Sequence, residues 1–487
     1  MTARFSSWLI FLYLITGVLV LVNSSLSSNN FNSAYVQLGI LALVFVNCLG
    51  ILHANKNCIG LALFYALISY VFIFTRIAVL SFFPEEARWF GEELQYTSSE
   101  IANTIYYIAG FSGLFYLGLV PFKRKRTKVV TPPTELLSKI VKANFKKVLF
   151  IGSIPIVINI ASYALLAVGR GGETSLAYAF TSFAFNHDIY TLITVALVAL
   201  VWNEINTINK WFFIIWACFF ILGGTITGGK GSIYTLALCS LFILLIRGDF
   251  LIRLTTSKLF LFVLIGFLSG MVFVVADGIR YAGYANRGLA LSVNEITSLG
   301  LDYISLDEVT LALSAIARRL SHFEYIAIIV NNTGDFQREL INPIQSLQVF
   351  MNFILLGSPF PDEKIYSLQL FKVAYYGFPL DVVLDGKGPH GDYIPLPGLA
   401  FLLFGPFLGL LYAFVLGFFS RLAYDFICRT RYKYSYLYIL CFWFIYNTLV
   451  NDSFGLDGFL QKFSIYLFTL LSFILLFKVF TTKYKVR

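Results

Sequence analysis

Long apolar runs recur along the whole sequence and are separated by shorter polar segments. A helix needs about 20 mostly apolar residues to cross the hydrocarbon core of a bilayer. Only 13% of the residues are charged, whereas roughly a quarter are charged in a soluble domain. The sequence therefore predicts an all-α polytopic integral membrane protein, because a helix satisfies its backbone hydrogen bonds within itself.

About twelve of these runs have the length and composition expected of transmembrane helices. We predict them at 8–23, 35–52, 59–82, 102–121, 148–168, 188–203, 211–227, 232–246, 257–276, 397–419, 434–450 and 462–480. The first run follows Arg4 and resembles a signal peptide, but no small-residue cleavage pattern follows it. We therefore expect this run to be retained as the first span.

Lysine and arginine predict the orientation, because cytoplasmic loops carry an excess of positive charge. If the N-terminus lies in the cytoplasm, positive charge falls in the inner connections and in the tail 483–487. This bias predicts an even number of spans, with both termini on the cytoplasmic side of a bacterial inner membrane. The net charge of +10 then reflects membrane topology, and we expect no nucleic-acid partner.

The basic segment 127–147 lies on the inner side in this arrangement. We expect it to rest on anionic lipid headgroups, which attract basic segments beside a membrane. A regulatory docking site is the alternative, although nothing else in the segment supports it.

One long polar stretch interrupts the pattern between the ninth and tenth spans. It divides the chain into a transmembrane bundle at 1–276, a large external, periplasmic loop at 277–396, and three further spans at 397–487. Helical apolar spacing at 304–331, and an apolar segment at 343–356, predict short helices in the loop. We expect these helices to pack on the bundle rather than to form an independent domain.

Two clusters of basic side chains lie in this loop. Arg280 and Arg287 follow the ninth span, and the planar fork of arginine suits bidentate contact with diphosphate oxygens. Snorkelling to the membrane interface is the ordinary alternative for an arginine at a span end. The second cluster consists of Arg318, Arg319, His322 and Glu324. Helical spacing places Arg319 and His322 on one face, and a structural salt bridge is the alternative role.

Two other segments also contain residues suited to chemistry. His390 and Asp392 lie in a glycine-flanked loop just before the tenth span. A histidine can take a proton from a hydroxyl near neutral pH, and Asp392 either orients it or only solvates the loop. Lys230 stands in a glycine-rich turn, but the next residue is Gly231, so the sequence does not match a nucleotide-binding phosphate loop. The turn is either an anion site at a helix start or a tight connection.

Arg76 lies inside the third apolar run. A charge within a span is costly and indicates a functional site, unless the side chain snorkels to the nearby outer interface. The histidines and cysteines show no metal-ligand spacing, so we expect neither a metal nor another cofactor. We expect the cysteines to be small packing residues.

Taken together, these segments resemble the bacterial O-antigen (oligosaccharide repeat-unit) polymerase family. The resemblance rests on Gly228-Gly-Lys230 before an apolar span, Arg280-Tyr-Ala-Gly283, Arg319-Leu-Ser-His-Phe-Glu324, and His390-Gly before the Pro- and Gly-rich segment 395–409. It covers the C-terminal half of the chain, while the N-terminal half resembles the family only in hydropathy. The family usually has arginine where this chain has Lys230.

The resemblance implies a membrane glycosyltransferase that joins undecaprenyl-diphosphate-linked oligosaccharide repeat units at the outer face of the inner membrane. It implies catalytic roles for Arg280 and Arg319, which would neutralise the leaving diphosphate, and for His390, which would act on the accepting hydroxyl. The substrate-binding residues that it implies are Lys230, Arg287, Arg318, His322, Glu324 and Asp392. Its partners would be the lipid-linked donor and acceptor, membrane lipid and a chain-length regulator.

Two other functions remain open at this point. An O-antigen ligase-type transferase shares the topology, the large outer loop and the lipid-diphosphate donor. A polysaccharide flippase or transporter predicts ionisable groups or broken helices near mid-membrane. Charge is sparse within the predicted spans and the long loop lies outside, which favours a transferase.

Overall fold

The computed structural model describes residues 5–27, 29–54, 59–83, 96–120, 136–166, 185–226, 236, 322–331, 395–430 and 456–481. Within these ranges the chain is mostly helical and contains no β-strand. Four helical stretches are long and apolar enough to cross a membrane, namely Phe5–Leu26, Ala34–His53, Gly60–Phe82 and Phe404–Asp425. The expected helical class is therefore confirmed for the described residues, and these four stretches have the length and composition of membrane spans.

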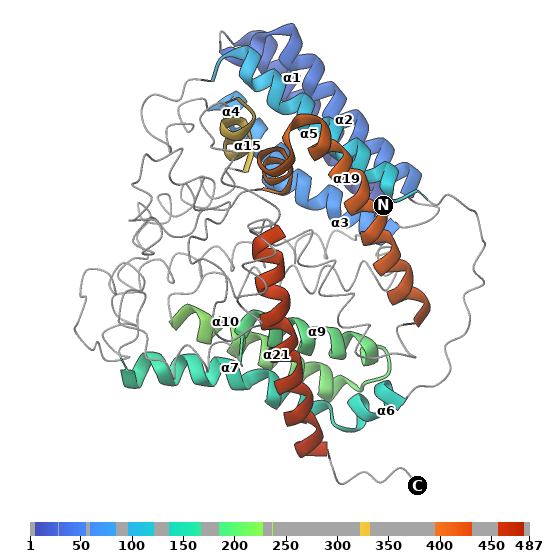
Figure 1. Cartoon of the computed structure of the whole chain (residues 1–487), viewed down its shortest axis with the longest axis vertical. Coiled ribbons are helices and arrows are strands. Elements are labelled where there is room, and N and C mark those ends of the chain that lie inside the picture. Colours follow the sequence, from blue (N-terminus) through green and yellow to red (C-terminus); the bar gives the residue numbers. More distant parts are fainter. Residues whose placement is uncertain are drawn as a thin grey trace, which may run out of the picture.

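One group of helices is built around α5, which packs against both α2 and α19 (Figure 1). Helix α1 packs in turn on α2 and α4, and α2 also contacts α3. The bounds are α1 (Phe5–Leu26), α2 (Ala34–Ala54), α3 (Ile59–Ser69), the π-helix η2 (Tyr70–Phe74), α4 (Thr75–Phe82), α5 (Ser98–Gly118), α15 (His322–Asn331) and α19 (Leu396–Thr430). Because α3, η2 and α4 follow one another without a gap, they form one continuous helical stretch.

A second group of helices packs around α7 and α9. Its bounds are α6 (Leu136–Ala143), α7 (Phe145–Leu166), α9 (His187–Val201), α10 (Thr207–Ile226) and α21 (Leu456–Thr481). Helix α7 contacts α9, α10 and α21, and α6 lies against α9 and α7. These helices coincide with four predicted spans, at 148–168, 188–203, 211–227 and 462–480.

The number of spans stays a prediction. The runs at 257–276 and 434–450, and nearly all of the run at 232–246, lie outside the described residues. The same is true of most of the predicted outer loop, of which α15 and the last residues before α19 are described. Helix α15 falls inside 304–331, where helical spacing was predicted, and it packs on α5 and α19.

The run predicted as one span at 397–419 is broken. Gly405 has φ 75° and ψ −175°, a conformation that glycine adopts readily and other residues avoid. Pro406 follows, and a proline disfavours the helical conformation in the residue before it. A Cβ on Gly409 would lie 2.8 Å from the Ala400 carbonyl oxygen, whereas nine residues of straight helix cover about 13 Å. The segment 396–404 is therefore a separate short helix that folds back on the longer part of α19.

Apolar side chains cover the outer faces of the helices. Phe11 and Val18 of α1, and Leu38 and Phe45 of α2, are each more than half exposed. Exposed apolar patches of this extent indicate contact with a membrane or a partner, and here they lie on helices long enough to span. Of the described cysteines, Cys48 is buried as expected of a packing residue, while Cys218 is exposed.

Helix α5 begins with a complete capping box. The Glu100 backbone N–H donates to Thr97 Oγ1 at 3.3 Å, and the Thr97 backbone N–H donates to Glu100 Oε2 at 2.7 Å. Two N–H groups at the start of the helix are thereby satisfied. Thr97→Ala is expected to lower the free energy of unfolding by about 1 kcal/mol, measured by denaturation of the purified protein in detergent. Thr207→Ala, at the first position of α10, is the control, and an equal loss in both variants would contradict this role of the cap.

Candidate functional site

The candidate site is centred on Arg76, in the continuous stretch formed by α3, η2 and α4. Arg76 is only 1% exposed. The wider turn of the π-helix Tyr70–Phe74 ends just before it, and the Thr75 hydroxyl donates to the Tyr70 carbonyl at 2.9 Å. Single π turns inside α-helices occur often at functional sites. The guanidinium therefore enters the interior from a locally irregular part of a membrane-length helix.

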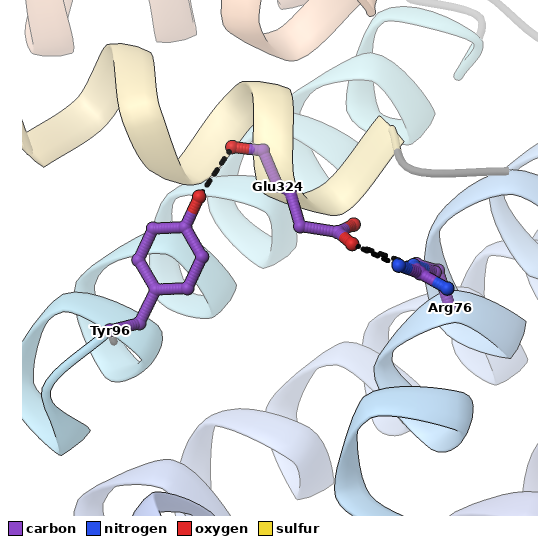
Figure 2. A network of polar contacts seen from close by, with 3 residues as sticks. All are labelled: Arg76, Tyr96 and Glu324. Atoms are coloured by element: carbon purple, nitrogen blue, oxygen red, sulfur yellow. Dashed lines mark hydrogen bonds and ion pairs between the residues drawn. The ribbon is translucent and has the colours of Figure 1, made fainter. Parts of the chain in front are cut away.

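Arg76 forms an ion pair with Glu324 of α15 (Figure 2). Its Nη2 lies 2.5 Å from Glu324 Oε1, and its Nε donates to the same oxygen at 2.7 Å. The side chains are 0% and 1% exposed. Snorkelling to the interface, one of the two roles considered for Arg76, is therefore wrong, because the charge lies in the interior beside an opposite charge.

The rest of α15 is fastened to the beginning of α5. The Tyr96 hydroxyl donates to the Glu324 carbonyl at 3.3 Å (Figure 2). At the other end of α15, Asn331 Nδ2 donates to the Glu100 carbonyl and to Thr104 Oγ1, each at 3.2 Å. Residues 322–329 are all buried, as expected of a helix that is surrounded by others. This part of the predicted outer loop is thus built into the helix bundle.

The second carboxylate oxygen of Glu324 differs from the first. Among the described residues, Oε2 is buried and has no hydrogen-bond partner. A buried polar atom without a hydrogen bond lowers the stability of the fold. Native proteins retain such atoms mainly where a bound water satisfies them or where they have a function.

His322 begins α15 and stacks on the ring of Phe72, in the π-helix. The ring centres are 4.7 Å apart and the planes differ by 18°. Phe72 belongs to the membrane-length stretch Gly60–Phe82, so His322 lies beside the same stretch as Arg76. The imidazole ring is therefore held against the π-helix.

Helix α15 also packs against the first part of α19. A Cβ on Gly398 would lie 3.3 Å from Ile329 Cδ1 and 3.4 Å from Ile326 Cγ1. The small glycine lets the two short helical segments approach closely, as small residues do between membrane helices. The beginning of α19 therefore lies beside α15.

Two of the predicted site residues, His322 and Glu324, belong to the described part of the chain. The other predicted site residues, which all lie outside it, are Lys230, Arg280, Arg287, Arg318, Arg319, His390 and Asp392. The sequence indicates Arg76 as a charge within a span, but it does not identify Arg76 as the partner of Glu324. Within the described ranges, no three His, Cys, Asp or Glu side chains are grouped to hold a metal ion.

Comparison with known proteins gives no family: no family model matches the chain, and no curated protein or solved structure is significantly similar to it. The class that the fold defines is a helical protein with membrane-length apolar helices. Its most unusual described feature is the buried ion pair between Arg76 and Glu324.

Proposed function

We propose that this chain is an O-antigen or related polysaccharide polymerase, an integral enzyme of the bacterial inner membrane. It joins undecaprenyl-diphosphate-linked oligosaccharide repeat units on the periplasmic side. The observation that carries the proposal is the contact between α15 and the first part of α19. These two helices directly follow the segments that contain Arg319 and His390.

Chain connectivity limits how far these residues lie from the contact. Arg319 stands three residues before the start of α15, and His390 stands six residues before the start of α19. A chain extends by at most about 3.6 Å per residue, and the proposal requires both short segments to bring their side chains to the contact between α15 and α19. An arginine and a histidine brought together at this contact would suit a substrate that has both a diphosphate and a reacting hydroxyl.

The proposed reaction is a glycosyl transfer. A sugar hydroxyl of the acceptor attacks the anomeric carbon of the donor, and the bond from that carbon to the diphosphate oxygen breaks with its electron pair on the oxygen. His390 takes the proton of the attacking hydroxyl. Arg280 and Arg319 neutralise the negative charge on the departing undecaprenyl diphosphate.

The bundle supplies a rigid support for this chemistry. Glu324 is held by Arg76, and its carbonyl accepts from Tyr96, so the helix that follows Arg319 has a fixed position. Preorganised positioning of charged groups contributes strongly to transfer reactions, because misplaced groups lose rate steeply. Glu324 therefore acts in this proposal as a positioning residue, and not as a contact to substrate.

The test is the polysaccharide ladder of a deletion strain complemented with variants. Deletion is expected to reduce the product to core plus a single repeat unit, and the wild-type gene restores the long chains. His390→Ala and Arg280→Lys are expected to lose the long chains at unchanged protein level, since each lacks a proposed catalytic group. His53→Ala, an exposed histidine of α2, is the matched control and should restore the ladder.

Two outcomes would replace the proposal. Loss of surface repeat units while polymer accumulates on its lipid carrier would identify a ligase. Loss of every outer-leaflet repeat unit would identify a flippase, which two observations favour as the second candidate. These are the ion pair that buries Arg76, a residue of a membrane-length helix, and the break at Gly405 of α19, since transporters use such charges and broken helices.

A further inference from the structure

A group of lysines lies at one end of the second helix group. Lys139 and Lys142 of α6, and Lys146 and Lys147 at the start of α7, are all exposed. Val141 of α6 is buried against the neighbouring helices. Helix α6 therefore packs through its apolar side and leaves its lysines outside.

Contacts between distant segments place the ends of several helices beside these lysines. Lys142 Nζ lies 3.7 Å from Glu204 Oε2, in the turn between α9 and α10. Lys146 Nζ lies 4.3 Å from the ring centre of Phe212. Lys147 Nζ donates to the Phe480 carbonyl at 2.8 Å, near the end of α21. The starts of α7 and α10 therefore meet the ends of α9 and α21 at one place.

Aromatic side chains border the same place. Lys210 Nζ lies 5.5 Å from the ring centre of Trp202, and Trp211 is 60% exposed. Tryptophan beside lysine is typical of the boundary between the apolar core and the headgroups of a membrane. The lysines are thus at a depth where lipid phosphates would be expected.

Positive charge prevails on this surface. We define the lysine surface by Lys139, Lys142, Lys146, Lys147 and Lys210. Among the described residues the carboxylate paired with it is that of Glu204, and this pair is half exposed. An exposed ion pair at 3.7 Å is weak, so the surface keeps most of its positive charge for a ligand.

We propose that the lysine surface binds the headgroups of anionic phospholipids, whose phosphodiester oxygens accept from the ammonium groups. Each lysine near an anionic membrane strengthens association roughly fivefold. This inference does not depend on the proposed glycosyl transfer, because the lysine surface belongs to helices other than α15 and α19. Its consequence is that the stability of the whole chain depends on the headgroup charge of the surrounding lipid.

The experiment compares lipids on the purified full-length chain in neutral detergent. Phosphatidylglycerol is titrated into the wild type and into a variant with Gln at residues 139, 142, 146 and 147, and the apparent Tm is followed. A lipid that binds the folded state raises Tm in proportion to its affinity. We expect the wild type to be stabilised, and the Gln variant to need at least about tenfold more lipid for the same rise.

The controls test whether the rise in Tm depends on the positive charge of the lysines. A variant with Arg at the same four positions keeps the charge and should respond as the wild type does. Phosphatidylcholine and free inorganic phosphate should raise Tm in none of the proteins. If the four-Gln variant does not fold, Lys139→Gln with Lys142→Gln gives the same comparison, since it keeps the contacts of Lys146 and Lys147. An equal response in wild type and Gln variants, or to phosphatidylcholine or phosphate, would overturn the proposal.

Discussion

Arg76→Ala is expected to lower the free energy of unfolding by about 3–5 kcal/mol, because it leaves the carboxylate of Glu324 buried without an opposite charge. Both side chains are almost fully buried, so neither charge can regain water without moving a helix. Glu324→Gln should cost a similar amount, since it removes the negative charge that pairs with Arg76 while keeping the shape of the side chain. Equilibrium denaturation of the purified variants in detergent measures both losses.

A double variant shows whether the loss comes from the pair. Arg76→Met combined with Glu324→Leu replaces both charges by apolar groups of similar volume, a change that is often neutral or stabilising for a buried ion pair. We expect the double variant to regain most of the lost stability. If its loss equals the sum of the single losses, the two residues act independently, and the ion pair does not hold α15 in place.

Gly417→Ala is expected to cost about 3 kcal/mol, the upper end of the usual range for overpacking. A Cβ on Gly417 would press on the carbonyl oxygen of Phe115 and lie 3.3 Å from the Gly118 Cα atom. Both neighbours are backbone, which cannot rotate aside as a side chain does. The loss should appear in the same denaturation measurement, and Gly118→Ala, whose Cβ would meet the backbone of Phe414 and Phe418, should match it.

The matched control is Gly113, which lies on α5 together with Gly118. A Cβ on Gly113 has Val46 Cγ1 at 3.6 Å as its nearest neighbour, an ordinary contact. Gly113→Ala should therefore be neutral or stabilising by up to about 1 kcal/mol, because alanine favours a helix. A similar loss in Gly113→Ala and Gly417→Ala would show that the close crossing of α5 and α19 is not what these glycines preserve.

The helices could be predicted from the sequence because each corresponds to an apolar run of its own. The runs at 35–52 and 59–82 match α2 and the continuous stretch formed by α3, η2 and α4 within two residues. Local composition is enough to predict these helices, since a long apolar run has few other stable conformations in a membrane. The prediction of one span at 397–419 is wrong at Gly405, although Gly405 followed by Pro406 is a local signal for a break.

The partner of Arg76 could not be predicted in the same way. Spacing rules connect residues one or two helical turns apart, whereas 248 positions separate Arg76 and Glu324. In the sequence, Arg76 lies in the third apolar run and Glu324 lies in the predicted outer loop. Only the packing of α15 on α4 and η2 brings the two side chains together. The roles of Arg280, Arg319 and His390 stay predictions, because these residues lie outside the described part of the chain.

The distance along the chain between the two charges has a consequence for biosynthesis. At roughly 5–20 residues per second, the ribosome needs about ten to fifty seconds to make the 248 positions from Arg76 to Glu324. If the helix with Arg76 inserts into a membrane during that time, it does so before Glu324 exists, and an arginine costs up to about 3.5 kcal/mol at the centre of a span. The apolar residues of Gly60–Phe82 help to offset this cost until Glu324 is made. A nascent chain that stops before residue 324 therefore lacks the carboxylate that pairs with Arg76 in the folded protein.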